Sequence, residues 1–258
     1  MMGISLKFVT QKEQAAEMKV IPLNEGLYSV TKEKVWTPIS QKNSDSSANT
    51  LSLCPFLVVG NDELIVLDTG LGLLRDGKPT IVSILQKLGY NPDHVTKVLL
   101  SHLHKDHTGG IGYFSDDVFI QNFKNATIYL QNKELEYALT QAENPSYDIQ
   151  ILSELSTLPN VYRQEEVTGT VSNAISFEMT GGHSPFHQVF WIKSGDETYF
   201  YGADNLPVAS YLKYPTAYKS DFDGKKAMIL RKNWGLQAKE NHWSVLFYHD
   251  WDHNIIKF

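Results

Sequence analysis

The chain has 258 residues, of which 42% are hydrophobic and 20% charged, and its 23 basic and 29 acidic residues give a net charge of -6. This length suits a globular protein with a substantial core, and we expect residues 1–258 to form a single domain. The acidic balance argues against a non-specific nucleic-acid binder, which needs a basic surface to displace counterions from phosphate. The single cysteine, Cys54, excludes an internal disulfide and a cysteine-rich zinc module, and its apolar neighbours predict burial.

No stretch approaches the ~18 consecutive apolar residues that a membrane-spanning helix requires. Residues 1–8 also lack the long apolar segment of a secretory signal. We therefore expect a cytoplasmic protein that binds neither nucleic acid nor membranes.

The first hundred residues predict strands, one helix and a further strand. Apolar periodicity indicates, in order, a strand pair or meander over 19–36 around a turn at 24–26, a hairpin over 51–67, a helix over 79–88 and a buried strand over 95–100. The polar stretch 40–49 predicts an exposed loop near the mouth of a site.

The remaining chain alternates strands with longer helical segments. Its apolar pattern predicts a strand over 126–130, helices over 132–142 and 147–158, a strand over 175–179, a hairpin over 189–201, a helix over 224–241 and a strand over 244–248. Six aromatic residues in the middle of the chain line a substrate pocket or form the local core: Tyr113, Phe114, Phe119, Phe123, Tyr137 and Tyr147.

Three histidines and one aspartate follow the strand predicted over 95–100 within six residues: His102, His104, Asp106 and His107. If the backbone stays extended beyond the strand, the side chains at 102, 104 and 106 project from one side. Neutral imidazoles and a carboxylate suit zinc and other borderline divalent ions. The motif therefore predicts a metal site.

This His102-Leu-His104-Lys-Asp106-His107 segment resembles the signature of the metallo-β-lactamase superfamily, and the resemblance covers roughly residues 51–250. It implies an α+β fold, a four-layer αββα sandwich with a dinuclear metal site at one edge of its sheets. It also implies further ligands: His183 after two glycines, the bridging Asp204 and His249 near the end of the chain.

The resemblance divides these ligands between two ions. It implies His102, His104 and His183 on the first ion, Asp106, His107 and His249 on the second, and Asp204 between them. Asp68, in the Leu67-Asp68-Thr69-Gly70 segment, and His187 would support the ligands from behind. His253 is an alternative to His249, whereas Asp221 and Asp223 fit turns or a helix cap.

Seven candidate ligands exceed the three that a single catalytic zinc usually takes, and so imply two Zn²⁺ ions or other divalent metals such as Fe, Mn or Co. By resemblance, a hydroxide bridging the two ions would attack a lactone, an ester or a related small substrate. Asp106 would be the catalytic residue that passes a proton to the leaving group.

The chain looks most similar to the superfamily branch that contains N-acyl homoserine lactonases and organophosphate hydrolases. Flavodiiron oxidoreductases of this fold carry a carboxylate where His104 stands, which argues against them. Many lactonases have a tyrosine three residues after the bridging aspartate, but this chain has Pro207 there. The candidates to replace that tyrosine are Tyr211, Tyr214 and Tyr218.

Two other functions stay open. One is a persulfide dioxygenase of the same fold with a single iron, and the other is a metal-binding protein without turnover. We expect a small-molecule substrate, and a homodimer is left open.

Overall fold

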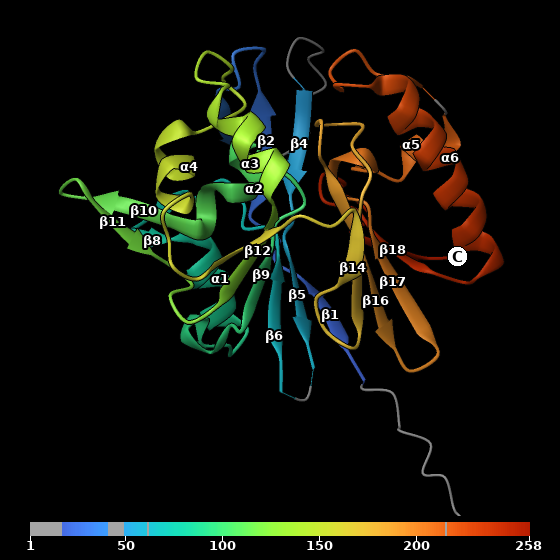
Figure 1. Ribbon diagram of the computed structural model, residues 1–258, viewed down its shortest axis with the longest axis horizontal. Helices are drawn as coiled ribbons and strands as arrows, with labels where there is room; N and C mark the ends of the chain where they lie inside the picture. Colours follow the sequence, from blue (N-terminus) through green and yellow to red (C-terminus); the bar gives the residue numbers. More distant parts are fainter. Residues whose placement is uncertain (1–16, 41–48, 61, 215) are drawn as a thin grey trace, which may run out of the picture.

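Two six-stranded sheets face each other at the centre of the molecule, and helices cover their outer faces (Figure 1). The structure is a computed structural model that describes residues 17–40, 49–60, 62–214 and 216–258. The loop expected over 40–49 therefore lies almost wholly outside the described residues.

The first sheet combines antiparallel and parallel strands. Its order is β1 (Lys19–Pro22), β5 (Phe56–Val59), β6 (Leu64–Leu67), β9 (Lys97–Leu99), β12 (Thr127–Gln131) and β13 (Val161–Gln164). β5 and β6 form the expected antiparallel hairpin, while β6, β9, β12 and β13 run parallel to one another. Helices α1 (Thr80–Lys87), α3 (Asn132–Leu139) and α4 (Ile149–Leu155) supply buried side chains to the core on its outer face.

The second sheet has the order β14 (Thr168–Thr170), β15 (Ile175–Met179), β16 (Gln188–Ser194), β17 (Glu197–Tyr201), β18 (Ser244–Leu246) and β19 (Ile255–Lys257). β15, β16 and β17 are antiparallel, as the hairpin over 189–201 predicts, but β17 and β18 are parallel. The long helix α6 (Gly224–Glu240) connects these two parallel strands and packs on the outer face of the sheet (Figure 1).

Smaller elements complete the chain. A three-stranded sheet has the order β3 (Trp36–Ile39), β2 (Gly26–Val30) and β4 (Asn49–Leu53), and two ribbons pair β7 (Leu74–Arg75) with β8 (Lys78–Pro79) and β10 (Gly112–Ser115) with β11 (Val118–Gln121). The short helices are η1 (Pro92–His94), α2 (Lys105–Thr108), η2 (Gly109–Ile111), η3 (Ala203–Asn205) and α5 (Ser210–Lys213).

Three apolar cores separate four layers. Successive residues of β6 point to opposite sides, with Val66 in the core under the helices and Ile65 and Leu67 in the core between the sheets. A third core joins the outer face of the second sheet to Trp234 and Ala238 of α6. Because the central strands β5 and β6 are buried on both faces, their sequences are continuously hydrophobic. This arrangement confirms the α+β, four-layer αββα fold that the resemblance implies.

Two local expectations were wrong. β1 and β2 do not pair across the turn at 24–26, since β1 joins β5 in the first sheet and β2 joins β3 and β4. The apolar run 51–59 is divided at Pro55, whose missing N–H cannot continue a ladder, so that β4 and β5 belong to different sheets. The metal motif, whose course the sequence left open, is extended as far as His104 and then turns, because α2 begins at Lys105.

Strand direction brings the motif-bearing loops to one edge. Parallel pairing aligns Leu67 at the end of β6 with Leu99 at the end of β9, and Asp68 N–H donates to the Leu99 carbonyl at 3.0 Å. In the second sheet, parallel pairing aligns Tyr201 with Leu246, so the loops after β17 and β18 leave side by side. Among the helices described, none is long and apolar enough to cross a membrane.

Candidate metal centre

All seven ligands predicted from the sequence come together at this edge. They form two groups, in each of which the candidate ligand atoms lie within 4.8 Å of one another: His102, His104, His183 and Asp204, and Asp106, His107 and His249. The first group is supplied by the loops after β9, β15 and β17, and the second by α2 and the loop after β18. His253 is exposed and belongs to neither group.

The first group presents three imidazole nitrogens to a common point. His104 Nδ1 lies 3.0 Å from His102 Nε2 and 3.1 Å from His183 Nε2. Nitrogens held about 2.0–2.1 Å from a zinc ion in a tetrahedron are roughly 3.3 Å apart. The spacing of the three nitrogens is therefore close to that of zinc ligands.

Asp204 lies between the two groups and turns one oxygen toward each. Its Oδ2 is 3.3 Å from His183 Nε2 in the first group. Its Oδ1 is 3.2 Å from His107 Nε2 and 3.1 Å from His249 Nε2 in the second. Asp106 completes the second group with Oδ2 at 3.6 Å from His249 Nε2. This arrangement fits a carboxylate that contacts two cations.

The outward nitrogens of three of these rings lie beside oxygen acceptors. Nδ1 of His107 is 2.8 Å from Asp68 Oδ2, Nδ1 of His183 is 2.9 Å from Asp221 Oδ1, and Nδ1 of His249 is 2.7 Å from the Ser52 carbonyl. Donation of each Nδ1–H to its acceptor leaves the lone pair of Nε2 facing the group, as metal ligation requires. The donor set therefore fits divalent cations of the zinc type.

Two inward atoms, 3.2 Å from each other, do not form a hydrogen bond of acceptable geometry. His107 Nε2 and Asp204 Oδ1 are buried, and neither makes a hydrogen bond of acceptable geometry to a described residue. Buried polar atoms without partners are costly, so such a pair facing a common point is the expected mark of a ligand that the protein accommodates there.

The electrostatics of the site separate its histidines. Burial, together with the neighbouring histidines, holds the pKa of His102 and His104 well below the ordinary value, so both rings are neutral. Burial also acts to lower the pKa of His107, but Asp204, Asp68 and Asp106 hold it well above the ordinary value. Burial would raise the pKa of Asp204, yet His249, His107 and His183 hold it well below. Asp204 is thus ionised and available to cations.

Asp68 is the centre of a buried hydrogen-bond network behind the second group. Its Oδ1 accepts from the Ser101 N–H at 2.8 Å, and its Oδ2 accepts from the Ser101 hydroxyl at 2.7 Å and the Tyr201 hydroxyl at 2.6 Å. Asp68 adopts a positive φ of 54°, which aims the carboxylate at His107. Tyr201, at the end of β17, was not identified from the sequence.

His187 lies behind the first group and outside it. Its ring stacks on His102 with centroids 5.0 Å apart, and its Nδ1 is 3.1 Å from Asn205 Nδ2. Asn205 in turn accepts the His183 N–H at 2.9 Å, so it fixes the loop that carries this candidate ligand. Asn205, next to the recognised Asp204, was missed because an amide after a motif aspartate has no distinctive pattern.

Asp221 lies in a turn, as the sequence indicated, but its contact with a candidate ligand was not recognised from the sequence. It contacts His183 Nδ1, whereas the helix cap is Asp223, which accepts from the Lys226 N–H at 3.0 Å. Only the fold brings the loop before α6 against the loop after β15. The buried Arg231 of α6, 3.5 Å from Asp221 Oδ2, gave no signal in the sequence either.

The two groups open into a cavity of about 800 Å³, within the range of small-molecule sites. Four of the aromatic residues that the sequence suggested for the substrate pocket line this cavity: Tyr137, Tyr147, Tyr211 and Tyr218. Tyr214 is 57% exposed and does not line the cavity, while Pro207 does. Phe123 is core, as the simpler reading expected, and Phe114 is exposed.

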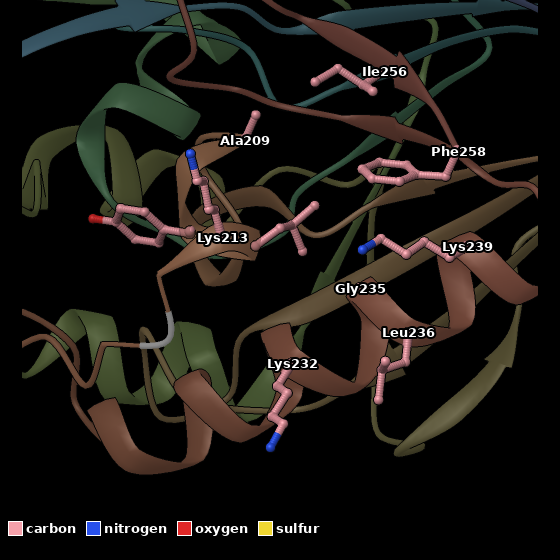
Figure 2. Close-up of a pocket in the computed structure, with 10 residues that line it drawn as sticks. Ala209, Lys213, Lys232, Gly235, Leu236, Lys239, Ile256 and Phe258 are labelled. Carbon is pink, nitrogen blue, oxygen red and sulfur yellow. The ribbon is translucent and has the colours of Figure 1, made fainter.

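A second cavity, of about 530 Å³, lies between α5, α6 and β19 (Figure 2). Its lining contains no carboxylate, imidazole or thiol, and combines apolar side chains such as Phe258 with the lysines 213, 232 and 239. Tyr211 lines both cavities. The lining of the second cavity therefore lacks the side chains that usually ligate zinc-type metals, and the candidate metal site is the first.

Residues 55–238 match the Metallo-beta-lactamase superfamily, and this match covers well over half of the chain. The chain belongs to this superfamily.

N-acyl homoserine lactonases are similar to part of the chain. An N-acyl homoserine lactonase of Bacillus thuringiensis is 35% identical over 115 residues, 44% of this chain and 39% of the relative. The N-acyl homoserine lactonase AttM of Agrobacterium fabrum is 32% identical over 124 residues, 43% of this chain and 41% of the relative. The chain thus matches about two-fifths of the length of these relatives.

Solved structures agree on the fold over nearly the whole chain. A probable metal-dependent hydrolase from Staphylococcus aureus has a TM-score of 0.76 at 18% identity, covering 94% of this chain and 93% of its own. AidC, a dizinc quorum-quenching lactonase in complex with a product, has a TM-score of 0.72 at 22% identity, covering 94% of each chain.

Proposed function

We propose that the protein is a metal-dependent hydrolase that opens lactones or cleaves related small esters, with zinc as its expected metal. The observation that carries this proposal is the position of Asp204, whose two carboxylate oxygens face the two groups of candidate ligands separately. The similarity to N-acyl homoserine lactonases supports the substrate class.

Seven residues would hold the cations: His102, His104 and His183 on one side, Asp106, His107 and His249 on the other, and Asp204 between. Two divalent cations, when bound there, would lower the pKa of a water between them and polarise the substrate carbonyl. Asp68 and Asp221 would keep His107 and His183 in the tautomer that ligation needs. His187 would support His102 by stacking.

Asp106 would also handle a proton. It lines the cavity with its side chain 10% exposed, so a substrate in the cavity is within its reach. A carboxylate there can take the proton of the attacking water and return it to the alcohol that leaves the carbonyl carbon. The net reaction adds one water and releases a hydroxy acid from a lactone, or an acid and an alcohol from an ester.

The second group favours this proposal over a persulfide dioxygenase with a single iron. One iron would leave Asp106, His107 and His249 converging on an empty centre. The 800 Å³ cavity into which both groups open also favours a hydrolase over a metal-binding protein without turnover, because it offers space for a substrate.

The test is a hydrolysis screen of metal-stripped protein, before and after addition of zinc. The substrates are N-acyl homoserine lactones of increasing acyl length, a simple aliphatic lactone, an aryl ester and a phosphotriester. We expect turnover of lactones or esters only after zinc is restored. Absence of turnover with every substrate, or oxygen uptake by iron-loaded protein with a persulfide, would contradict the proposal.

A further inference from the structure

A buried arginine touches the supports of the first group without belonging to it. Arg231 is 1% exposed and lies on the inner face of α6 with Trp234 and Ala238. Its Nη1 donates to the Asn205 carbonyl at 3.0 Å, and its Nη2 donates to the Thr216 carbonyl at 2.7 Å. Because a buried guanidinium is costly unless it is paired, its partners indicate its purpose.

One partner leads to the candidate metal ligand His183. Arg231 Nη1 lies 3.5 Å from Asp221 Oδ2, and the other oxygen of Asp221 lies 2.9 Å from His183 Nδ1. Asp221 Oδ2 has no hydrogen bond to a described residue, so the guanidinium is the group that opposes its charge. The side chain of Asp221 is 5% exposed, which leaves little room for water to replace that interaction.

The other face of the guanidinium leads to the cavity wall. Arg231 Cζ lies 5.0 Å from the ring centroid of Tyr211 and 5.4 Å from that of Tyr218. The two rings are stacked 4.3 Å apart at 12°, and both line the cavity together with Asp204. A cation beside two such rings holds them in place by cation–π attraction.

We propose that Arg231 is a positioning residue that acts on two parts of the site. Through Asp221 it sets the orientation of His183, and through the stacked pair it sets the wall formed by Tyr211 and Tyr218. The role of Arg231 in positioning the Tyr211–Tyr218 wall rests on the proposed function. Its role in orienting His183 requires only that the site binds a metal.

The first test measures zinc affinity of metal-stripped protein by competition with a chromophoric chelator. Arg231→Met removes the charge, Asp221→Asn keeps the shape of the carboxylate, and Lys232→Met is the control. Lys232 is the next residue on α6 and is exposed, with its nitrogen directed away from Gly235 in Figure 2. We expect Arg231→Met and Asp221→Asn each to weaken one zinc site by roughly 10–100-fold, and the control to match the native protein.

The double variant tells whether Arg231 acts through Asp221. If it does, Arg231→Met combined with Asp221→Asn loses no more zinc affinity than the weaker-binding single variant. Fully additive losses, or an affinity of Arg231→Met equal to that of Lys232→Met, would overturn the proposal. Should Arg231→Met fail to fold, Asp221→Asn decides alone, since native zinc affinity in that variant is also a refutation.

The second test separates the wall from the metal. At saturating zinc and with the best substrate of the screen, Tyr211→Ala is expected to raise KM roughly tenfold without changing zinc affinity. Arg231→Met should raise KM and weaken zinc, while Tyr214→Ala, an exposed neighbour, should do neither. A native KM in Arg231→Met would refute the role of Arg231 in positioning Tyr211 and Tyr218. Absence of any hydrolysis would instead refute the proposed function and leave the zinc measurements valid.

Discussion

Asp68 Oδ2 lies 2.8 Å from His107 Nδ1, and this contact joins the end of β6 to α2, the helix that carries Asp106 and His107. The same oxygen accepts the Tyr201 hydroxyl at 2.6 Å, so one buried carboxylate also ties the two sheets together beneath the site. The stability of the fold and the orientation of a candidate ligand therefore depend on the same atoms.

Tyr201→Phe removes one donor to this charged acceptor. A hydrogen bond to a charged group contributes about 1.5–3 kcal/mol, so we expect the free energy of unfolding to fall by about 2 kcal/mol. Tyr199→Phe, on the same strand, deletes a half-buried hydroxyl that donates to Glu197 at 3.2 Å and should cost less than about 1 kcal/mol. Urea denaturation of metal-stripped protein measures both. Equal losses of unfolding free energy in the two variants would show that the hydrogen bond from Tyr201 to Asp68 stabilises the fold no more than the bond from Tyr199 to Glu197.

Glu25 makes stability depend on pH. The side chain is buried, which raises its pKa to about 7 against the opposing effects of the Leu71 N–H and Arg75. The folded protein thus keeps a proton that the unfolded chain releases near 4.5. This group's stabilisation is complete below pH 4.5 and is lost as pH rises through 7, a change of about 3 kcal/mol.

Glu25→Gln removes that titration. The difference in unfolding free energy between the native protein and Glu25→Gln should shift by about 3 kcal/mol in favour of the variant between pH 4.5 and pH 8. Denaturant titrations at several pH values measure this shift. Parallel pH profiles for the two proteins would refute it.

Two glycines differ sharply in what they tolerate. A Cβ on Gly110, which follows α2, would lie 1.9 Å from the Thr69 carbonyl oxygen, and backbone cannot move aside cheaply. Gly110→Ala should therefore destabilise by about 3 kcal/mol and weaken zinc binding by the second group. In the middle of α6, a Cβ on Gly235 meets only the end of Leu212 at 3.0 Å.

Gly235→Ala should therefore be neutral or stabilise by up to about 1 kcal/mol, since alanine favours helix more than glycine. Thermal unfolding compares the two variants directly. A Gly110→Ala variant as stable as Gly235→Ala would mean that the contact between Thr69 and the metal loop is not tight.

Asp106→Asn tests the proton-transfer role. The amide cannot accept a proton, so turnover should fall at least about 100-fold, and one zinc should bind more weakly. Asp196→Asn, in the exposed turn between β16 and β17, should leave both unchanged. Native turnover in Asp106→Asn would refute this role in the reaction.

Local signals predicted most strands and the four candidate ligands of the 102–107 motif, whereas the four layers, His183, Asp204 and His249 followed from the resemblance to the superfamily. Apolar runs define the strands, and the motif places four candidate ligands within six residues. The supports of these ligands are different in kind. Tyr201, Asp221 and Arg231 contact the site from distant positions, through pairings that only the assembled sheets and α6 create. No periodicity or spacing marks such residues.

The sequence left the fold undecided or misled where the same local residues are compatible with two backbone conformations. Residues 24–26 suit a hairpin turn, yet β1 and β2 enter different sheets because their best apolar partners are distant. The motif after β9 could continue extended or turn, and α2 turns it, which brings His107 onto Asp68. Such choices depend on tertiary packing that outweighs local preference.

Elemental analysis of metal-stripped protein, after reloading with zinc and removal of excess metal, shows directly whether each chain holds a pair of ions. Two zinc ions per chain are expected for the native protein, and one for His183→Ala or His249→Ala, each of which removes a ligand from a different group. A native protein that retains one zinc or none would contradict the paired site on which the account depends.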